Sequence, residues 1–212
     1  MVRLLCWLLL GVSASAAWAQ DAPEVPSGEH QYAERDRISD EMRKLSKRGV
    51  WSGVERKYAQ LKALGLKLSA SDHLTAAYAA RESGDLTLVH ERLKAAAAIE
   101  GTKEIIDWLY DIDHNYGRVT LVVDSKRTAE LVVKEMPLDP NQRRAVEAAV
   151  EACKKRGRFT GLLPSGHYEF ATQPFRVVPG VGVRVEVSPK MRRKGLVEPV
   201  IIYRDLPSAT GN

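Results

Sequence analysis

Apolar residues recur at helical spacing through the first half of the chain. Gly49 and Gly65 directly follow the first two series, and glycine in that place is typical of a helix C-terminus. The predicted helices cover residues 38–48, 52–64, 74–81, 86–99 and 102–112. Together they predict a helical domain over residues 34–114. Residues 20–33 have no periodic apolar positions, so we expect a flexible lead there.

Alternating apolar and polar residues replace helical spacing after Gly117. Residues 119–123 and 129–133 predict two strands that pair with each other, and residues 197–203 a last strand, which Pro199 places at a sheet edge. Between them, Asp139-Pro140-Asn141 opens a helix that runs to about Arg156, before Gly157.

The segment from Phe159 to Ser188 predicts a β-hairpin that ends in a half-buried strand. Its turn signals are Pro164-Ser165-Gly166, where Gly166 is expected at positive φ, and Pro179-Gly180. Four valines then alternate with polar or small residues, at positions 181, 183, 185 and 187. The predicted fold class is α+β, with a β-sandwich-like domain and one inserted helix over residues 117–206 and a flexible tail over residues 207–212.

The predicted helices repeat at an offset of 35 residues, which places Gly49 on Gly84 and Tyr58 on Leu93. Trp51 likewise falls on Leu86, Val54 on Val89 and Leu64 on Ile99. With aromatic residues at Trp51 and Tyr58 and alanines ahead of Gly84, this part resembles tetratricopeptide-type repeats. The resemblance implies stacked helical hairpins with a concave surface that binds peptides, and residues 102–112 as a closing helix.

The motifs LLPSGHYEF, from Leu162, and FRVVPG, from Phe175, resemble PEGA-like surface β-sandwich modules. DSKRTAEL, over residues 124–131, is similar to the earlier strand-turn-strand of such modules. The resemblance implies an exported, noncatalytic module used for attachment or assembly.

The N-terminus has the pattern of a secretory signal peptide over residues 1–19. Arg3 precedes an apolar run, and Ala17-Trp18-Ala19 forms an A-x-A cleavage site before Gln20. We therefore expect a periplasmic protein, with secretion as the alternative, and no transmembrane segment in the mature chain. Cleavage removes Cys6 and leaves Cys153, expected as a buried helical residue, with intermolecular pairing as the alternative.

The charge of the chain is mildly basic, with 32 Lys and Arg against 27 Asp and Glu. The dense basic runs, at residues 154–158 and 190–194, are short and lack interleaved aromatic residues. Such runs are typical of solvated loops and helix ends, so we expect no nucleic-acid partner. The charged residues of the helical pairs, Glu55, Arg56, Lys57, Glu91, Arg92 and Lys94, are likewise predicted to be solvated, with a groove lining as the alternative.

Candidate chemistry is sparse. Asp111 to Gly117 begins like a calcium loop, but its glycine falls one place late and Val122 stands where a bidentate glutamate would close the shell. The histidines, at positions 30, 73, 90, 114 and 167, lack the spacing of a helical metal pair. No nucleophile elbow surrounds a serine or cysteine. We therefore predict no catalytic, cofactor-binding or metal residues, no cofactor, and no enzyme.

These features predict a noncatalytic adaptor of the cell envelope that binds protein partners in a larger assembly, with outer-membrane or cell-wall components among the candidates. The alternative is a module that binds envelope glycan or another surface ligand through the β-domain. A hydrolase with a site assembled from distant residues is the third hypothesis.

Overall fold

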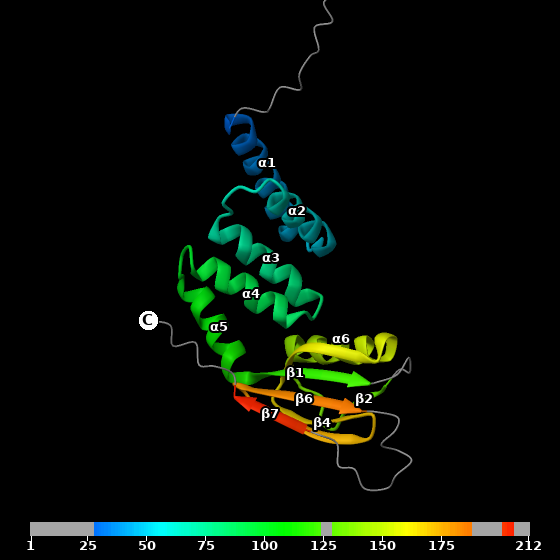
Figure 1. Ribbon diagram of the computed structural model, residues 1–212. Coiled ribbons are helices and arrows are strands. Elements are labelled where there is room, and N and C mark those ends of the chain that lie inside the picture. The colour runs from blue at the N-terminus through cyan, green and yellow to red at the C-terminus, as the bar shows by residue number, and fades with distance from the viewer. Residues whose placement is uncertain (1–27, 124–128, 188–200, 206–212) are drawn as a thin grey trace, which may run out of the picture.

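The computed structural model describes residues 28–123, 129–187 and 201–205, the last of these by backbone alone. Figure 1 shows the helices of the first half stacked above the sheets of the second. The predicted signal peptide, most of the predicted lead, Pro199, the basic run at 190–194 and the tail at 207–212 lie outside the described residues.

Five helices form the first half of the described chain, as predicted. They are α1 (Gly28–Lys47), α2 (Trp51–Ala63), α3 (Ala70–Glu82), α4 (Leu86–Ala97) and α5 (Lys103–Asn115). Because α1 begins at Gly28, the last part of the predicted flexible lead is helical. The glycines after α1 and α3 adopt the left-handed conformation, with φ of +69° at Gly49 and +77° at Gly84.

Helix α3 begins at Ala70, four residues before the predicted start at residue 74. Ser69 is the N-cap, its hydroxyl accepts from the Asp72 N–H, and the Asp72 carboxylate accepts from the Ser69 N–H. This reciprocal capping box satisfies donors that would otherwise lack partners at the helix start. Asp72 is therefore buried in the first turn.

The two hairpins α1–α2 and α3–α4 bury most of the apolar residues that the 35-residue offset pairs, although Trp51 is only half-buried whereas its counterpart Leu86 is buried. Val54 and Val89 are both fully buried, and so are Tyr58 and Leu93 at 6% and 0% exposure. Arg56 and Glu91 point to solvent. The pairing fails at its last position, because Leu64 is half-buried whereas Ile99 is 54% exposed.

The strands form two sheets. One has the order β3-β1-β6-β7, with β1 parallel to β6 and the other neighbours antiparallel, and the other has the order β2-β4-β5. Their bounds are β1 Tyr116–Val123, β2 Leu131–Val133, β3 Arg158–Pro164, β4 Gly166–Phe170, β5 Gln173–Val177, β6 Val181–Val187 and β7 Ile201–Asp205. The predicted pairing of residues 119–123 with 129–133 is wrong, because β1 pairs with β3 and β6 while β2 pairs with β4. The predicted last strand is present as β7, at a sheet edge.

The predicted turn at Pro164-Ser165-Gly166 does not make a hairpin, because β3 and β4 lie in different sheets. Gly166 does not have positive φ, so the argument for a glycine there is also wrong. The tight hairpin joins β4 to β5 through Ala171 and Thr172, whose φ angles of 49° and 72° match a two-residue loop with both positions left-handed. The turn at Gly180, with φ of +73°, is as predicted.

Helix α6 (Pro140–Arg156) is the predicted inserted helix, capped by the Asp139 carboxylate and ended by Gly157 at φ +65°. Its inner residues share one core with both sheets, including Val146 and Cys153 of the helix, Leu121 and Val185 of one sheet and Phe170 of the other. Cys153 is buried, as predicted, and burial raises the pKa of its thiol to about 11. Of the alternating valines of β6, Val183 and Val185 are buried in this core and Val187 packs against it.

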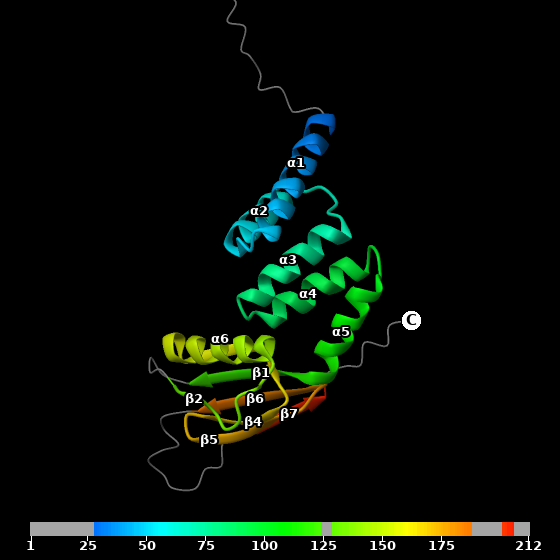
Figure 2. The same ribbon diagram turned by 180° about the vertical axis from the view of Figure 1, so that it is seen from behind.

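The two halves pack directly on each other. Helix α5 ends at Asn115 and β1 begins at Tyr116, so no linker separates them. Helix α6 lies between the α3–α4 pair and the sheets, as both views show (Figure 1, Figure 2). Arg144 of α6 bonds Glu82 of α3 at 2.8 Å, and Tyr116 and Ala145 join the core of the helical half.

Gly84 makes the closest approach at this junction. A Cβ there would lie 2.6 Å from the Arg144 carbonyl oxygen and 2.9 Å from the Ala148 Cβ. The backbone of the α3–α4 turn therefore rests on α6, and only a residue without a side chain fits.

Candidate functional site

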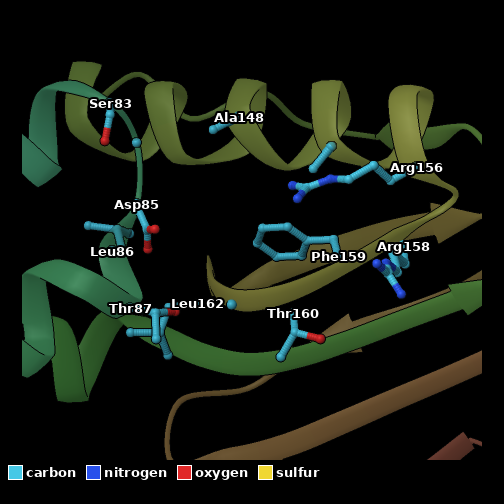
Figure 3. Close-up of a pocket in the computed structure, with 13 residues that line it drawn as sticks. Ser83, Asp85, Leu86, Thr87, Ala148, Arg156, Arg158, Phe159, Thr160 and Leu162 are labelled. Carbon is cyan, nitrogen blue, oxygen red and sulfur yellow. The ribbon is translucent and has the colours of Figure 1, made fainter. Parts of the chain in front are cut away.

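A groove of about 470 Å³ opens at the junction of the two halves. Figure 3 shows the α3–α4 turn at one end, α6 along one side and β3 along the other. Its lining consists of residues 83–87, Ala148, Ala152, Arg156 and residues 158–162. Both halves of the chain thus contribute to one surface.

The α6 side of the groove is built from residues one helical turn apart. Ala148, Ala152 and Arg156 follow each other at a spacing of four, so they share one face of the helix. The two alanines leave room between the helix and the strand, and the Arg156 side chain points along this space toward the α3–α4 turn, on the α6 side of Phe159 (Figure 3).

The β3 side presents an aromatic ring held in place by a glycine. Phe159 and Gly161 point to the same side of the strand, and a Cβ on Gly161 would lie 2.6 Å from the Phe159 ring. The ring therefore lies across Gly161. Phe159 also packs against the core of the β half and remains half-buried in the groove (Figure 3).

Strand β3 is at an edge of its sheet among the described strands. Val123 donates its N–H to Gly157 O at 3.1 Å, and Ser165 donates to Asn115 O at 2.9 Å. Bonded and non-bonded pairs alternate along an antiparallel ladder, so the odd-numbered residues of β3 bond to β1. The backbone groups of Arg158, Thr160 and Leu162 consequently point away from β1, toward the open edge.

Charges differ between the two ends of the groove. Arg156 and Arg158 line one end and are exposed, and the last turn of α6 also carries Lys154 and Lys155, of which Lys155 pairs with Glu151 at 2.8 Å. At the other end Asp85 caps α4, and its carboxylate accepts from the Leu88 N–H at 3.0 Å. The open end is therefore strongly basic.

The segment from Asp111 to Gly117, which begins like a calcium loop in the sequence, is the end of α5 followed by the start of β1. Asn115 Nδ2 donates to Asp111 at 2.6 Å, and Asp113 lies 3.1 Å from His90 Nε2. Within the described residues, no group of three His, Cys, Asp or Glu side chains is arranged to hold a metal ion.

The histidines are distributed over both halves. His73 lies beside Tyr58, with 2.8 Å between its Nδ1 and the tyrosine hydroxyl, and burial lowers its pKa. His114 stacks on Tyr110, while His30 and His167 are exposed on α1 and β4.

The prediction of solvated charges on the helical pairs is wrong for Arg92. It is only 6% exposed and donates two bonds to the Glu55 carboxylate, at 2.6 and 2.7 Å, and one to Ala76 O at 2.5 Å. Its guanidinium also lies 4.7 Å from the centre of the Tyr58 ring. These contacts join α2, α3 and α4, so this pair holds the two hairpins together.

Sequence reasoning did not find the groove. Its residues come from the α3–α4 turn, α6 and β3, and only their tertiary packing brings them together. Two local signals were present: alanines four residues apart on a predicted helix, and Phe159 two residues before Gly161 on a predicted strand.

The sequence matches no protein-family model, and no curated protein or solved structure is significantly similar to it. In the part of the chain that the structure describes, none of the helices is both long and apolar enough to cross a membrane.

Proposed function

We propose that this protein is a noncatalytic adaptor of the cell envelope, exported by a cleavable signal peptide, that binds protein partners of a larger assembly. The observation that carries the proposal is the junction groove. The two halves pack without a linker and form one surface, which contains the Phe159 ring and the edge of β3 that has no neighbour among the described strands. Such edges and grooves are common binding sites for extended segments of other proteins.

The side chains that line the groove support a binding role rather than a catalytic one. The Asp85 carboxylate serves as a helix cap, and Phe159 and the two alanines offer apolar surface. The resemblance of the first half to tetratricopeptide-type repeats and of the second to PEGA-like β-sandwich modules points the same way, since both imply attachment or assembly.

An affinity purification with a variant of the edge strand tests this function. The tagged full chain is incubated with an envelope extract, and the recovered material is identified by mass spectrometry and by glycan analysis. Thr160→Trp places a large ring on the exposed face of β3, the edge strand that lines the groove, and Gln60→Trp places the same ring on an exposed position of α2 as the control.

We expect the unchanged chain and Gln60→Trp to recover the same proteins, and Thr160→Trp to lose them while keeping its melting temperature. Recovery of glycan without a protein partner would support the alternative of a glycan-binding module. If all three chains recover the same proteins in equal amounts, the groove is not the binding site.

A further inference from the structure

Among the described strands, β3 has no neighbour on the side away from β1. This edge is the site of the further inference, which rests on the proposed function. We propose that an extended peptide segment of a partner adds to β3 as a new strand, with acidic residues over Arg156 and Arg158. The ligand class is thus an extended segment with an acidic end.

The backbone geometry provides the first step of the argument. Arg158, Thr160 and Leu162 direct their N–H and C=O groups away from β1. An exposed strand edge of this kind pairs readily with another chain, and proteins usually shield it. Here the α3–α4 turn closes one end of the groove, so about five residues of an added strand can lie beside residues 158–162, since both strands rise about 3.3 Å per residue.

The groove offers room and apolar surface beside that edge. The small side chains of Ala148 and Ala152 leave space on the α6 side of the groove, and the Phe159 ring projects from β3 toward this side (Figure 3). Side chains of an added strand alternate in direction, so every second one would face Phe159 and α6. Valine or another apolar residue fits these places.

The charge distribution specifies the rest of the ligand. Arg156 and Arg158 line the groove on one side; Lys154 and Lys155 of the same helix turn do not line it, and Lys155 pairs with Glu151 at 2.8 Å. Asp85 lies at the opposite end, already bonded to the α4 backbone. A peptide with carboxylates at the arginine end therefore complements the groove, whereas a basic end would be repelled.

Binding of designed peptides to the full chain tests the proposal. The probes are fluorescein-labelled nonapeptides with alternating valine and threonine and three aspartates at either the N-terminal or the C-terminal end, which covers both strand directions. Matching peptides with three lysines are the controls. Fluorescence anisotropy at low salt measures their dissociation constants.

Two variants separate the edge from the charges. Thr160→Pro removes one outward N–H and leaves the ladder to β1 intact, since that N–H faces away from β1. Arg156→Glu with Arg158→Glu reverses the basic end, and Arg176→Glu with Lys94→Glu makes the same charge change at exposed positions off the groove.

We expect one aspartate peptide to bind and both lysine peptides to bind at least about tenfold more weakly. Loss of one hydrogen bond should weaken binding about three- to tenfold for Thr160→Pro. The arginine reversal should weaken it about tenfold or more, with much less effect of the off-groove reversal. Melting curves check that every variant is folded.

Unchanged affinity in a folded Thr160→Pro protein would overturn strand addition, and equal effects of the two reversals would overturn recognition of the acidic end. Neither result would contradict the adaptor function, which fails separately if no protein partner is recovered from the envelope.

Amide hydrogen exchange is an independent test of strand addition. On binding, the N–H groups of Arg158, Thr160 and Leu162 should become protected, and no gain at these three positions would also contradict the proposal.

Discussion

Replacing Gly84 by alanine tests whether the two halves are held together at the α3–α4 turn. The added Cβ would lie 2.6 Å from the Arg144 carbonyl oxygen, so α6 or the turn must move. Gly84 also has φ of +77°, a conformation that costs alanine about 1 to 2 kcal/mol. Overpacking of a tight contact adds about 1 to 3 kcal/mol. We therefore expect a total loss of about 2 to 5 kcal/mol, summed from these two contributions.

Gly65→Ala is the matched control for this change. Gly65 follows α2 at the position that Gly84 occupies after α3, it has φ of +68°, and no atom lies within 4 Å of a Cβ built there. Gly65→Ala and Gly84→Ala share the cost of placing alanine at positive φ, and both reduce the conformational freedom of the unfolded chain. The difference between the two variants therefore isolates the contact with α6.

Urea unfolding followed by circular dichroism measures both free energies. We expect Gly84→Ala to lose about 1 to 3 kcal/mol more than Gly65→Ala, the share that overpacking contributes. Equal losses would refute the conclusion that the turn rests on α6, and with it the fixed geometry of the groove.

Three further predictions concern the helical stack and the hairpin. Tyr58→Ala and Leu93→Ala should each lower the free energy of unfolding by about 2 to 5 kcal/mol, because both side chains are buried. The controls Arg56→Ala and Glu91→Ala change exposed residues and should lower it by less than about 0.5 kcal/mol in the same thermal or urea unfolding. Small effects of the two buried substitutions would contradict a shared core. Replacing Ala171 and Thr172 by Asn and Gly should stabilise the chain by about 1 kcal/mol, since both residues have positive φ, and a lower melting temperature would count against the observed turn. Burial lowers the pKa of His73, so the unfolded chain binds the proton more tightly, and stability should fall as the pH drops from about 6.5 through the lowered pKa. His73→Gln should flatten that fall in urea titrations at several pH values, and an unchanged slope would contradict the assignment.

The sequence predicted the elements of this fold better than their pairing. Glycines after apolar series marked the ends of α1, α2 and α6, and alternating valines marked β6. These signals are local, because a cap or an alternating face is determined by neighbouring residues. The partners of β1 and β2 are not local, and both were assigned wrongly.

Long-range contacts also explain the remaining differences. Arg92 has the ordinary spacing of a surface residue on α4, and only the approach of Glu55 from α2 and of the Ala76 carbonyl from α3 buries it. Ala171 and Thr172 form the tight turn but are not of the residue types that usually mark one. Pro164-Ser165-Gly166 has those types, so it was the stronger turn signal in the sequence, and it was incorrect. The groove depends on both kinds of contact and could not be predicted from spacing.

Site-specific photo-crosslinking in intact cells tests the adaptor account most directly. A photoreactive phenylalanine analogue replaces Thr160 in the groove or, as the control, Gln60 on the exposed face of α2. The account predicts a discrete adduct at position 160 that fractionates with the envelope, is degraded by protease and is absent at position 60. Equal adducts at the two positions, or an adduct at 160 that glycan hydrolases remove and protease does not, would contradict it.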